Sequence, residues 1–377
     1  MKILSIILLL GVLCVLNAQE DPLYSSETDV LLTGYVAFNG EWVNNLRSFS
    51  ELQSDKGFNL SEASLLTTIN SSEKLSFFSV LTYKPRLSLN FMFAELSMKY
   101  SVSEEFNLKI GRFLLPINPI NSNYFAPANV GIALPSFITN HKLFPLNING
   151  VEFNGNILVA DGIDFNYHIV GGSYYKIQQT AEGVVGFFGR EGLYMDSDLK
   201  AVKQRLVRVD SINSFVPQMY WGSGFRTELG FYNNLKIGIG GFYSSEESTK
   251  QTADQKTVTT NVDLFAIGAD FRYSIFDFDL NSSLWFGIEE PVDSKNFVKK
   301  DYHMITWDLA YSGFKDITPY TRAELIRGMT KEDRTRILFG INYRPSYDFT
   351  FKLEYIRYLQ DFVEEFDILQ FSTIYSF

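Results

Sequence analysis

The sequence predicts an all-β fold, a transmembrane antiparallel β-barrel of about 16 strands with short turns at one end and long loops at the other. Three observations support this prediction. Apolar and polar residues alternate along many segments, and the last of these, Phe366 to Phe377, ends on an aromatic side chain. Aromatic residues make up 16% of the chain, a large share. After the N-terminal segment no apolar run approaches the roughly 18 residues of a membrane-spanning helix, so strands must carry the apolar residues.

The N-terminal segment has the pattern of a cleavable secretion signal. Lys2 provides a positive start, and residues 3–16 form an apolar stretch that is too short to span a bilayer. Ala18 offers a small side chain for cleavage. We therefore expect residues 1–18 to be a signal peptide and residues 19–377 to form a single barrel domain.

The chain's single cysteine, Cys14, falls inside this signal. Leu13 precedes it, where lipid attachment needs a small residue, and this argues against a lipoprotein. Cleavage after Ala18 removes Cys14 and with it any disulfide or thiolate chemistry. The formal net charge of −10 argues against a nucleic-acid-binding protein and suits a secreted surface protein with acidic loops.

Strand signals follow one another along the rest of the chain, separated alternately by short turns and longer polar connections. Asp161-Gly162 is a strong two-residue hairpin turn. An even number of strands places both termini at the end with the short turns. The expected strands are 30–38, 58–69, 75–83, 90–100, 106–113, 151–159, 163–170, 224–232, 235–244, 262–275, 278–288, 303–314, 317–327, 336–344, 349–358 and 366–377.

The alternation assigns each side chain to the lipid-facing or the inner surface. Apolar residues such as Leu96, Phe339 and Leu353 face outward, because only a closed barrel pairs the backbone groups of strands in lipid. A lumen with many charges cannot be a dry core, so we expect an aqueous channel. The inward set is Glu95, Lys99, Lys109, Asp164, His168, Arg226, Glu228, Lys236, Asp270, Arg272, Asp279, Asn281, Asp308, Arg322, Glu324, Arg336, Asn342, Arg344, Lys352 and Glu354.

The connection 114–147 has an unusual composition. It is long and apolar, it contains Pro116 and several further prolines, it has no Asp or Glu, and its only basic residues are His141 and Lys142. We expect this loop to fold into the barrel mouth and to constrict it. A cap packed on the rim, or a surface for a neighbouring subunit, is the alternative.

The step from a strand into this loop carries a family resemblance. Residues 106–113, Phe-Asn-Leu-Lys-Ile-Gly-Arg-Phe, are followed by Leu-Leu-Pro, and this step resembles the Gram-negative outer-membrane porins, most closely the phosphate-selective porin O and P type. Phe377 resembles the final aromatic residue that barrel assembly machinery recognises. The resemblance implies a 16-stranded barrel in the outer membrane, in contact with lipid and lipopolysaccharide, commonly a homotrimer, that passes small hydrophilic or anionic solutes. The chain departs from the family in lacking a dense lysine cluster.

Inward basic residues on neighbouring strands near the C-terminus would form one positive wall. Such a wall favours anions through charge and bidentate hydrogen bonds and predicts a mild anion preference. Its members are Arg322, Arg336, Arg344 and Lys352, and Lys109, Arg226 and Arg272 complete the basic pore-lining set. The alternative is a neutral wall in which carboxylates pair with these cations across strands. The carboxylates are Asp270, Asp308, Glu324 and Glu354.

Residues 196–210, in the fourth loop, combine apolar residues at helical spacing with several lysines and arginines. We expect a solvated loop helix. The alternative is a basic helix that gathers anions above the pore.

Signals for catalysis are weak. His141, His168 and His303 lie far apart in the sequence and near no nucleophile motif, and neither metal-ligand spacing nor a phosphate-binding loop is present. We expect no enzymatic activity, no cofactor and no metal site.

We expect passive diffusion of small hydrophilic solutes through the lumen. A substrate-specific uptake channel is one alternative, although the inward aromatic candidates, Tyr320 and Trp285, are too few for a sugar-binding slide. A surface adhesin or scaffold barrel with an occluded lumen is the other.

Overall fold

The computed structural model describes residues 28–44, 57–83, 93–119, 125–135, 145–177, 217–232, 234–251, 257–292, 299–328, 334–360 and 366–377. The expected signal peptide and the expected basic loop helix lie outside these residues. No helix in the described part of the chain is long and apolar enough to cross a membrane.

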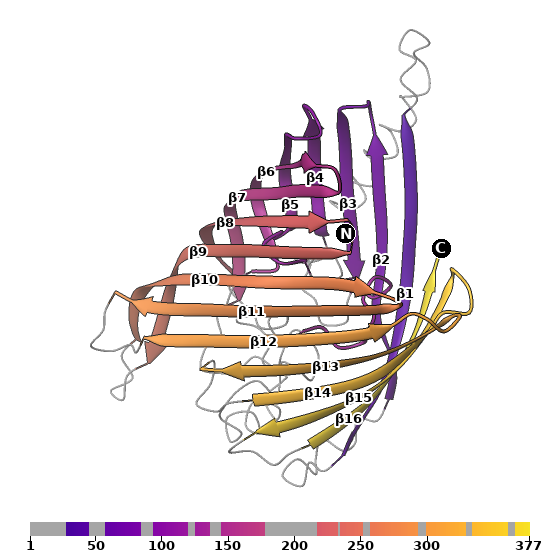
Figure 1. The fold of residues 1–377 in the computed structure, drawn as a ribbon. Helices are drawn as coiled ribbons and strands as arrows, with labels where there is room; N and C mark the ends of the chain where they lie inside the picture. The colour runs from indigo at the N-terminus through magenta and orange to yellow at the C-terminus, as the bar shows by residue number, and fades with distance from the viewer. Residues whose placement is uncertain are drawn as a thin grey trace, which may run out of the picture.

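Sixteen antiparallel strands form one closed barrel, in which each strand pairs with its neighbours in sequence and β16 (Phe366–Ser376) pairs with β1 (Asp29–Asn44) (Figure 1). The other strands are β2 (Gly57–Asn70), β3 (Leu75–Tyr83), β4 (Phe93–Ser101), β5 (Asn107–Leu114), β6 (Asn147–Ala160), β7 (Ile163–Ile177), β8 (Pro217–Phe231), β9 (Leu235–Gln251), β10 (Thr257–Ile275), β11 (Phe278–Pro291), β12 (Lys300–Tyr311), β13 (Ile317–Arg327), β14 (Arg334–Tyr343) and β15 (Phe349–Gln360).

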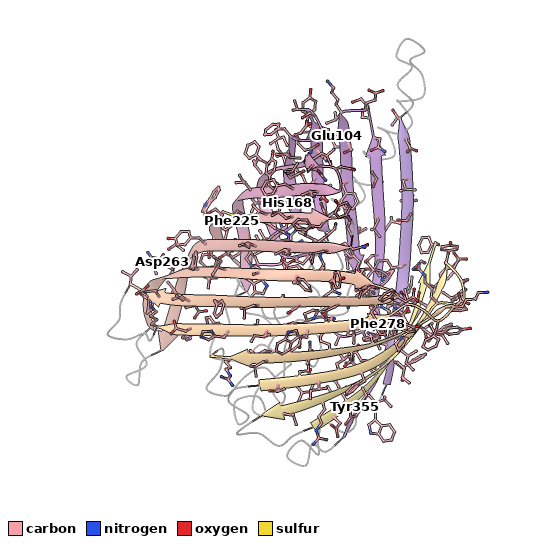
Figure 2. The ribbon with its side chains drawn as sticks, viewed as in Figure 1. Glu104, His168, Phe225, Asp263, Phe278 and Tyr355 are labelled. Carbon is pink, nitrogen blue, oxygen red and sulfur yellow. The ribbon has the colours of Figure 1, made fainter. Side chains whose placement is uncertain are left out.

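Short turns join β2 to β3, β4 to β5 and the later hairpins up to β14 and β15 at one end of the barrel. The start of β1 and the end of β16 lie at this end too, which we call the short-turn end. The opposite end, the long-loop end, carries the longer connections. In Figure 2, Phe278 lies at the short-turn end and Asp263 towards the long-loop end of the same hairpin.

This architecture confirms the predicted fold class, and every expected segment contains a strand. The largest boundary differences are at the long-loop end, where β8, β9 and β10 all extend beyond the expected bounds. In β9 and β10 the added residues are mostly polar on both faces, so the alternation fades from the sequence. The backbone ladder nevertheless continues, with Ser245 opposite Asp263 and Glu247 opposite Asn261.

The end of the chain closes the barrel. The Phe377 backbone N–H donates to the Gly34 carbonyl at 2.9 Å, and the Gly34 N–H donates to the Phe377 carbonyl at 2.8 Å. A side chain at position 34 would collide with the Phe377 ring, because a Cβ there would lie 2.6 Å from it. The terminal aromatic residue is thus part of the seam between the first and last strands.

The outer surface is apolar, and its short-turn end is aromatic. Phe339 and Leu353 are 56% and 47% exposed on the outer face. Aromatic rings on neighbouring strands lie against one another around the short-turn end, as in the aromatic girdles where a membrane barrel meets the lipid headgroups. The ring pairs include Tyr343 with Phe351, Phe349 with Tyr375 and Phe278 with Tyr311.

We expect Phe339→Arg to lower the free energy of unfolding by about 2–4 kcal/mol, because it places a charge on the lipid-facing surface. Asn156→Arg is the matched control, since residue 156 faces the lumen opposite Asn166, and we expect it to change stability by less than about 1 kcal/mol. Urea unfolding of the protein folded in phospholipid vesicles measures both values. Equal losses in the two variants would contradict the assignment of faces.

Candidate functional site

The strand register places the predicted charged residues on the inner face, with one exception. Lys109, Arg226, Arg272, Arg322, Arg336, Lys352, Glu324 and Glu354 all lie at inward positions of their strands. Arg344 instead follows β14, in the turn before β15, where it is exposed and its Nη2 donates to the Tyr347 carbonyl at 3.4 Å. One member of the expected positive wall, Arg344, therefore lies in a turn at the rim rather than on a strand.

The connection after β5 enters the lumen. Leu115 and Ile117 are fully buried. Ile117 lies on the inner wall at two glycines, because a Cβ at Gly240 on β9 would come within 2.2 Å of its carbonyl oxygen, and a Cβ at Gly224 on β8 within 3.0 Å of its Cγ2. The missing side chains leave room for the backbone of the loop to lie against the sheet.

The same loop reaches the opposite wall. Phe125 and Ala126 pack against a buried cluster of Tyr35 and Ala37 on β1 and Ile374 on β16. These strands lie across the barrel from β8 and β9 in the closed strand order. The described parts of this connection therefore contact both sides of the lumen, and we call residues 115–119 and 125–135 the inner loop.

Lys352 on β15 holds the inner loop by its backbone. Its Nζ donates to the carbonyl oxygens of Ala126 at 2.7 Å, Gly131 at 3.1 Å and Asn129. The side chain is buried. Three carbonyl groups that lie away from any strand ladder thus share one ammonium group, which meets the requirement that buried backbone polar groups be hydrogen-bonded.

Glu354, two residues further along β15, binds the donors of the same loop. Its carboxylate accepts hydrogen bonds from the backbone N–H groups of Ile132 at 2.9 Å and Ala133 at 3.1 Å, and from the Tyr320 hydroxyl at 2.8 Å. The carboxylate is fully buried. Lys352 and Glu354 are therefore engaged with the loop rather than with solute.

Two arginines complete this clamp. Arg322 on β13 pairs with Asp308 and donates to the Ala133 carbonyl at 2.7 Å. Arg336 on β14 pairs with Glu324 and donates to the Leu134 carbonyl at 2.6 Å. These ion pairs match the neutral-wall interpretation. We call Arg322, Arg336, Lys352 and Glu354 the clamp residues.

Other inward charges are also paired. Lys109 bonds to Glu95, and His168 Nδ1 lies 2.7 Å from the Glu152 carboxylate. Asp270 pairs with Arg226 rather than with the clamp arginines. Arg226, Glu228, Lys236, Asp270 and Arg272 together form a connected charge network on β8, β9 and β10.

Apolar side chains cover part of the inner face towards the long-loop end, which the sequence analysis missed. Trp285 and Tyr320 do face inward and are buried, as expected. Trp285 packs with Leu115, Ile117 and further inward residues in one apolar cluster, whereas Tyr320 lies outside it and donates to Glu354. The strict alternation of these strands could have revealed them, since they occupy the same inward positions as the charges. The cluster includes Phe113, Ile148, Val170, Tyr174, Tyr220, Phe242, Leu264, Trp285, Tyr302, Met304 and Ile326.

The remaining site predictions have separate outcomes. Pro116 lies in the inner loop between two fully buried residues. His141 and Lys142 lie outside the described residues. Within the described residues, no group of three or more His, Cys, Asp or Glu side chains is arranged to hold a metal ion.

The fold is shared with several solved structures. No protein-family model matches the chain, and no curated protein matches it. OmpT of Vibrio cholerae, also described in a trimer form, is 10% identical, with 95% of this chain and 100% of that chain covered and a TM-score of 0.61. The anion-selective porin from Comamonas acidovorans is 13% identical, with 93% and 100% covered and a TM-score of 0.58. Salmonella typhi OmpF in complex with daunomycin is 11% identical, with 94% and 99% covered and a TM-score of 0.56. At these identities the likeness shows a common barrel fold.

We expect Lys352→Met to release the inner loop, because three buried carbonyl groups lose their donor, and to lower the free energy of unfolding by about 2–3 kcal/mol. Limited proteolysis in detergent should then cut between residues 125 and 135 faster than in the wild type. Lys99→Met is the control, since Lys99 faces the lumen and makes no ion pair within the described part of the chain. Unchanged cleavage in Lys352→Met would show that the clamp does not hold the loop.

Proposed function

We propose that this protein is an outer-membrane porin that passes small hydrophilic solutes by passive diffusion. The observation that carries the proposal is the combination of a closed barrel, apolar outside and charged inside, with a loop that is clamped across its lumen. Such a loop would set the size limit of the channel, while inward polar groups replace part of the hydration of a passing solute. Transport of this kind requires no covalent chemistry, and we propose no enzymatic activity.

The location and assembly follow from the same architecture. A 16-stranded barrel with a girdle of aromatic side chains around its short-turn end fits an outer membrane. The short-turn end would face the periplasm, and lipopolysaccharide would surround the outer half of the wall. A homotrimer is supported by the trimer form described for one structural neighbour. The position of Phe377 at the seam supports recognition of the chain end by barrel assembly machinery.

We propose at most a mild anion preference, and not a strict specificity for phosphate. Arg322, Arg336 and Lys352 bind carboxylates and loop carbonyls, so they present little free charge to a solute. Lys236 and Arg272 retain exposure in the lumen, with side chains 37% and 33% exposed, and Lys99 on β4 is also only partly buried there. A preference for anions would therefore arise on β4, β9 and β10.

A scaffold or adhesin barrel with an occluded lumen is the second candidate. The apolar cluster towards the long-loop end favours it, because inward side chains pack there against Leu115 and Ile117 of the inner loop. A substrate-specific uptake channel is less well supported, since the inward aromatic residues of this cluster are buried and do not line an open path.

Conductance distinguishes these functions. We expect the purified protein to give stepwise ion conductance in planar lipid bilayers. Replacing residues 125–135 with a Gly-Ser linker of equal length should raise the unitary conductance several-fold, roughly in proportion to the wider cross-section.

Three outcomes of this experiment have different meanings. Conductance in both proteins, larger without the inner loop, supports the porin. Conductance only after loop replacement supports the occluded barrel. Absence of conductance in both, with folding verified by heat-modifiable migration in gels, overturns the proposed channel.

A further inference from the structure

The charge network on β8, β9 and β10 has a buried centre. Arg226 donates from Nη1 and Nη2 to the two oxygens of Asp270 at 2.5 and 2.9 Å, and from Nη2 to Glu228 at 2.7 Å. A Cβ at position 238 would lie 2.5 Å from Arg226 Nη2 and 2.8 Å from Asp270 Oδ2. Gly238 therefore lets the guanidinium group lie flat on β9 and reach carboxylates on two strands.

Two further cations lie above this centre, on its solvent side. Arg272 and Lys236 are directly opposite each other on neighbouring strands. Arg272 Nη2 bonds to Glu228, and Lys236 Nζ lies 3.6 Å from the other oxygen of the same carboxylate. Like charges at directly opposed positions repel each other, and one shared carboxylate only partly offsets that repulsion.

The network carries an excess of positive charge. Three cations and two carboxylates leave a balance of +1. Arg226 is only 5% exposed, whereas Arg272 and Lys236 are 33% and 37% exposed, so the excess is presented to the lumen. Two further carboxylates lie beside the network without an ion pair to it among the described residues. Asp164 on β7 lies over Gly230, which is directly opposite Lys236, and accepts from Asn166 at 2.7 Å. Asp279 on β11 accepts from Ser274 at 2.6 Å.

The network lies next to the inner loop. Ile117 rests on Gly240, two residues along β9 from Gly238, and the exposed cations lie further towards the short-turn end. A solute that passes the loop from the long-loop end would next meet Arg272 and Lys236.

Resting on the proposed function, we propose that Arg272 and Lys236 form a transient binding site for the oxyanion group of a permeating solute, a carboxylate or a phosphate. The planar guanidinium fork of Arg272 matches two oxygens of such a group, and the ammonium of Lys236 supplies a second charge. Glu228 occupies the site when no solute is bound and competes with it, which keeps binding weak enough for release. The buried Arg226 and Asp270 hold Glu228 and the wall in place.

The test uses inorganic phosphate as the probe at constant pH. Phosphate should reduce the chloride conductance of the wild-type channel in a saturable way. Arg272→Gln and Lys236→Gln should each weaken the apparent affinity for phosphate about tenfold, since each removes a charge-assisted hydrogen bond. Glu228→Gln should strengthen it, because the competing carboxylate is neutralised. Arg344→Gln is the matched control, since it removes the same charge at the short-turn rim.

Equal losses in Arg272→Gln and Arg344→Gln would attribute the effect to diffuse charge and overturn the site, as would a linear, unsaturable response in the wild type. Calorimetric titration of the detergent-folded proteins with phosphate measures the same affinities without any need for conduction. An unchanged affinity in Arg272→Gln by calorimetry therefore overturns the site, whereas absent conductance with the expected calorimetric ranking overturns only the proposed channel.

Discussion

The interior of this barrel is governed by the need to satisfy backbone polar groups that lie outside the sheet. Every strand satisfies its own N–H and C=O groups in the ladder, but the inner loop crosses the lumen without regular structure. Unpaired groups in such a place cost about 1–3 kcal/mol each. Lys352 and Glu354 meet that need from one strand, binding carbonyls and N–H groups respectively. The clamp exists because the loop has no ladder of its own.

This requirement changes the meaning of the inward charges. The sequence predicts that Arg322, Arg336 and Lys352 form a selectivity wall, whereas in the structure they bind the inner loop. Arg322 and Arg336 each form an ion pair with one wall carboxylate and also donate to one carbonyl of the inner loop. The positive charge exposed in the lumen is therefore smaller than the number of inward cations suggests, and among the described residues it includes Lys99 on β4, Lys236 on β9 and Arg272 on β10.

The fold was predictable from the sequence because a lipid-facing strand must alternate with period two, and Phe366–Ser376 or Phe349–Gln360 show that rhythm clearly. The inward direction of Lys352 and Glu354 followed from the same rhythm. The partners of Lys352 and Glu354 could not be predicted, since any residue type can supply a loop backbone carbonyl or N–H group. A glycine within a strand, such as Gly240, predicts room for a loop, and only the structure identifies the neighbour as Ile117. The extension of β9 was missed where both faces are polar and the pattern carries no information.

The clamp also has a consequence for biogenesis. Its hydrogen bonds join residues that are 189 to 226 positions apart, and the anchoring side chains belong to three of the last four strands. The segment that crosses the pore is therefore synthesised long before its anchors and cannot be fastened until the final hairpins have been added to the sheet. In a partly assembled barrel the inner loop would lack its hydrogen-bond partners. The last strands to be added therefore close the barrel and bind the inner loop in the same step.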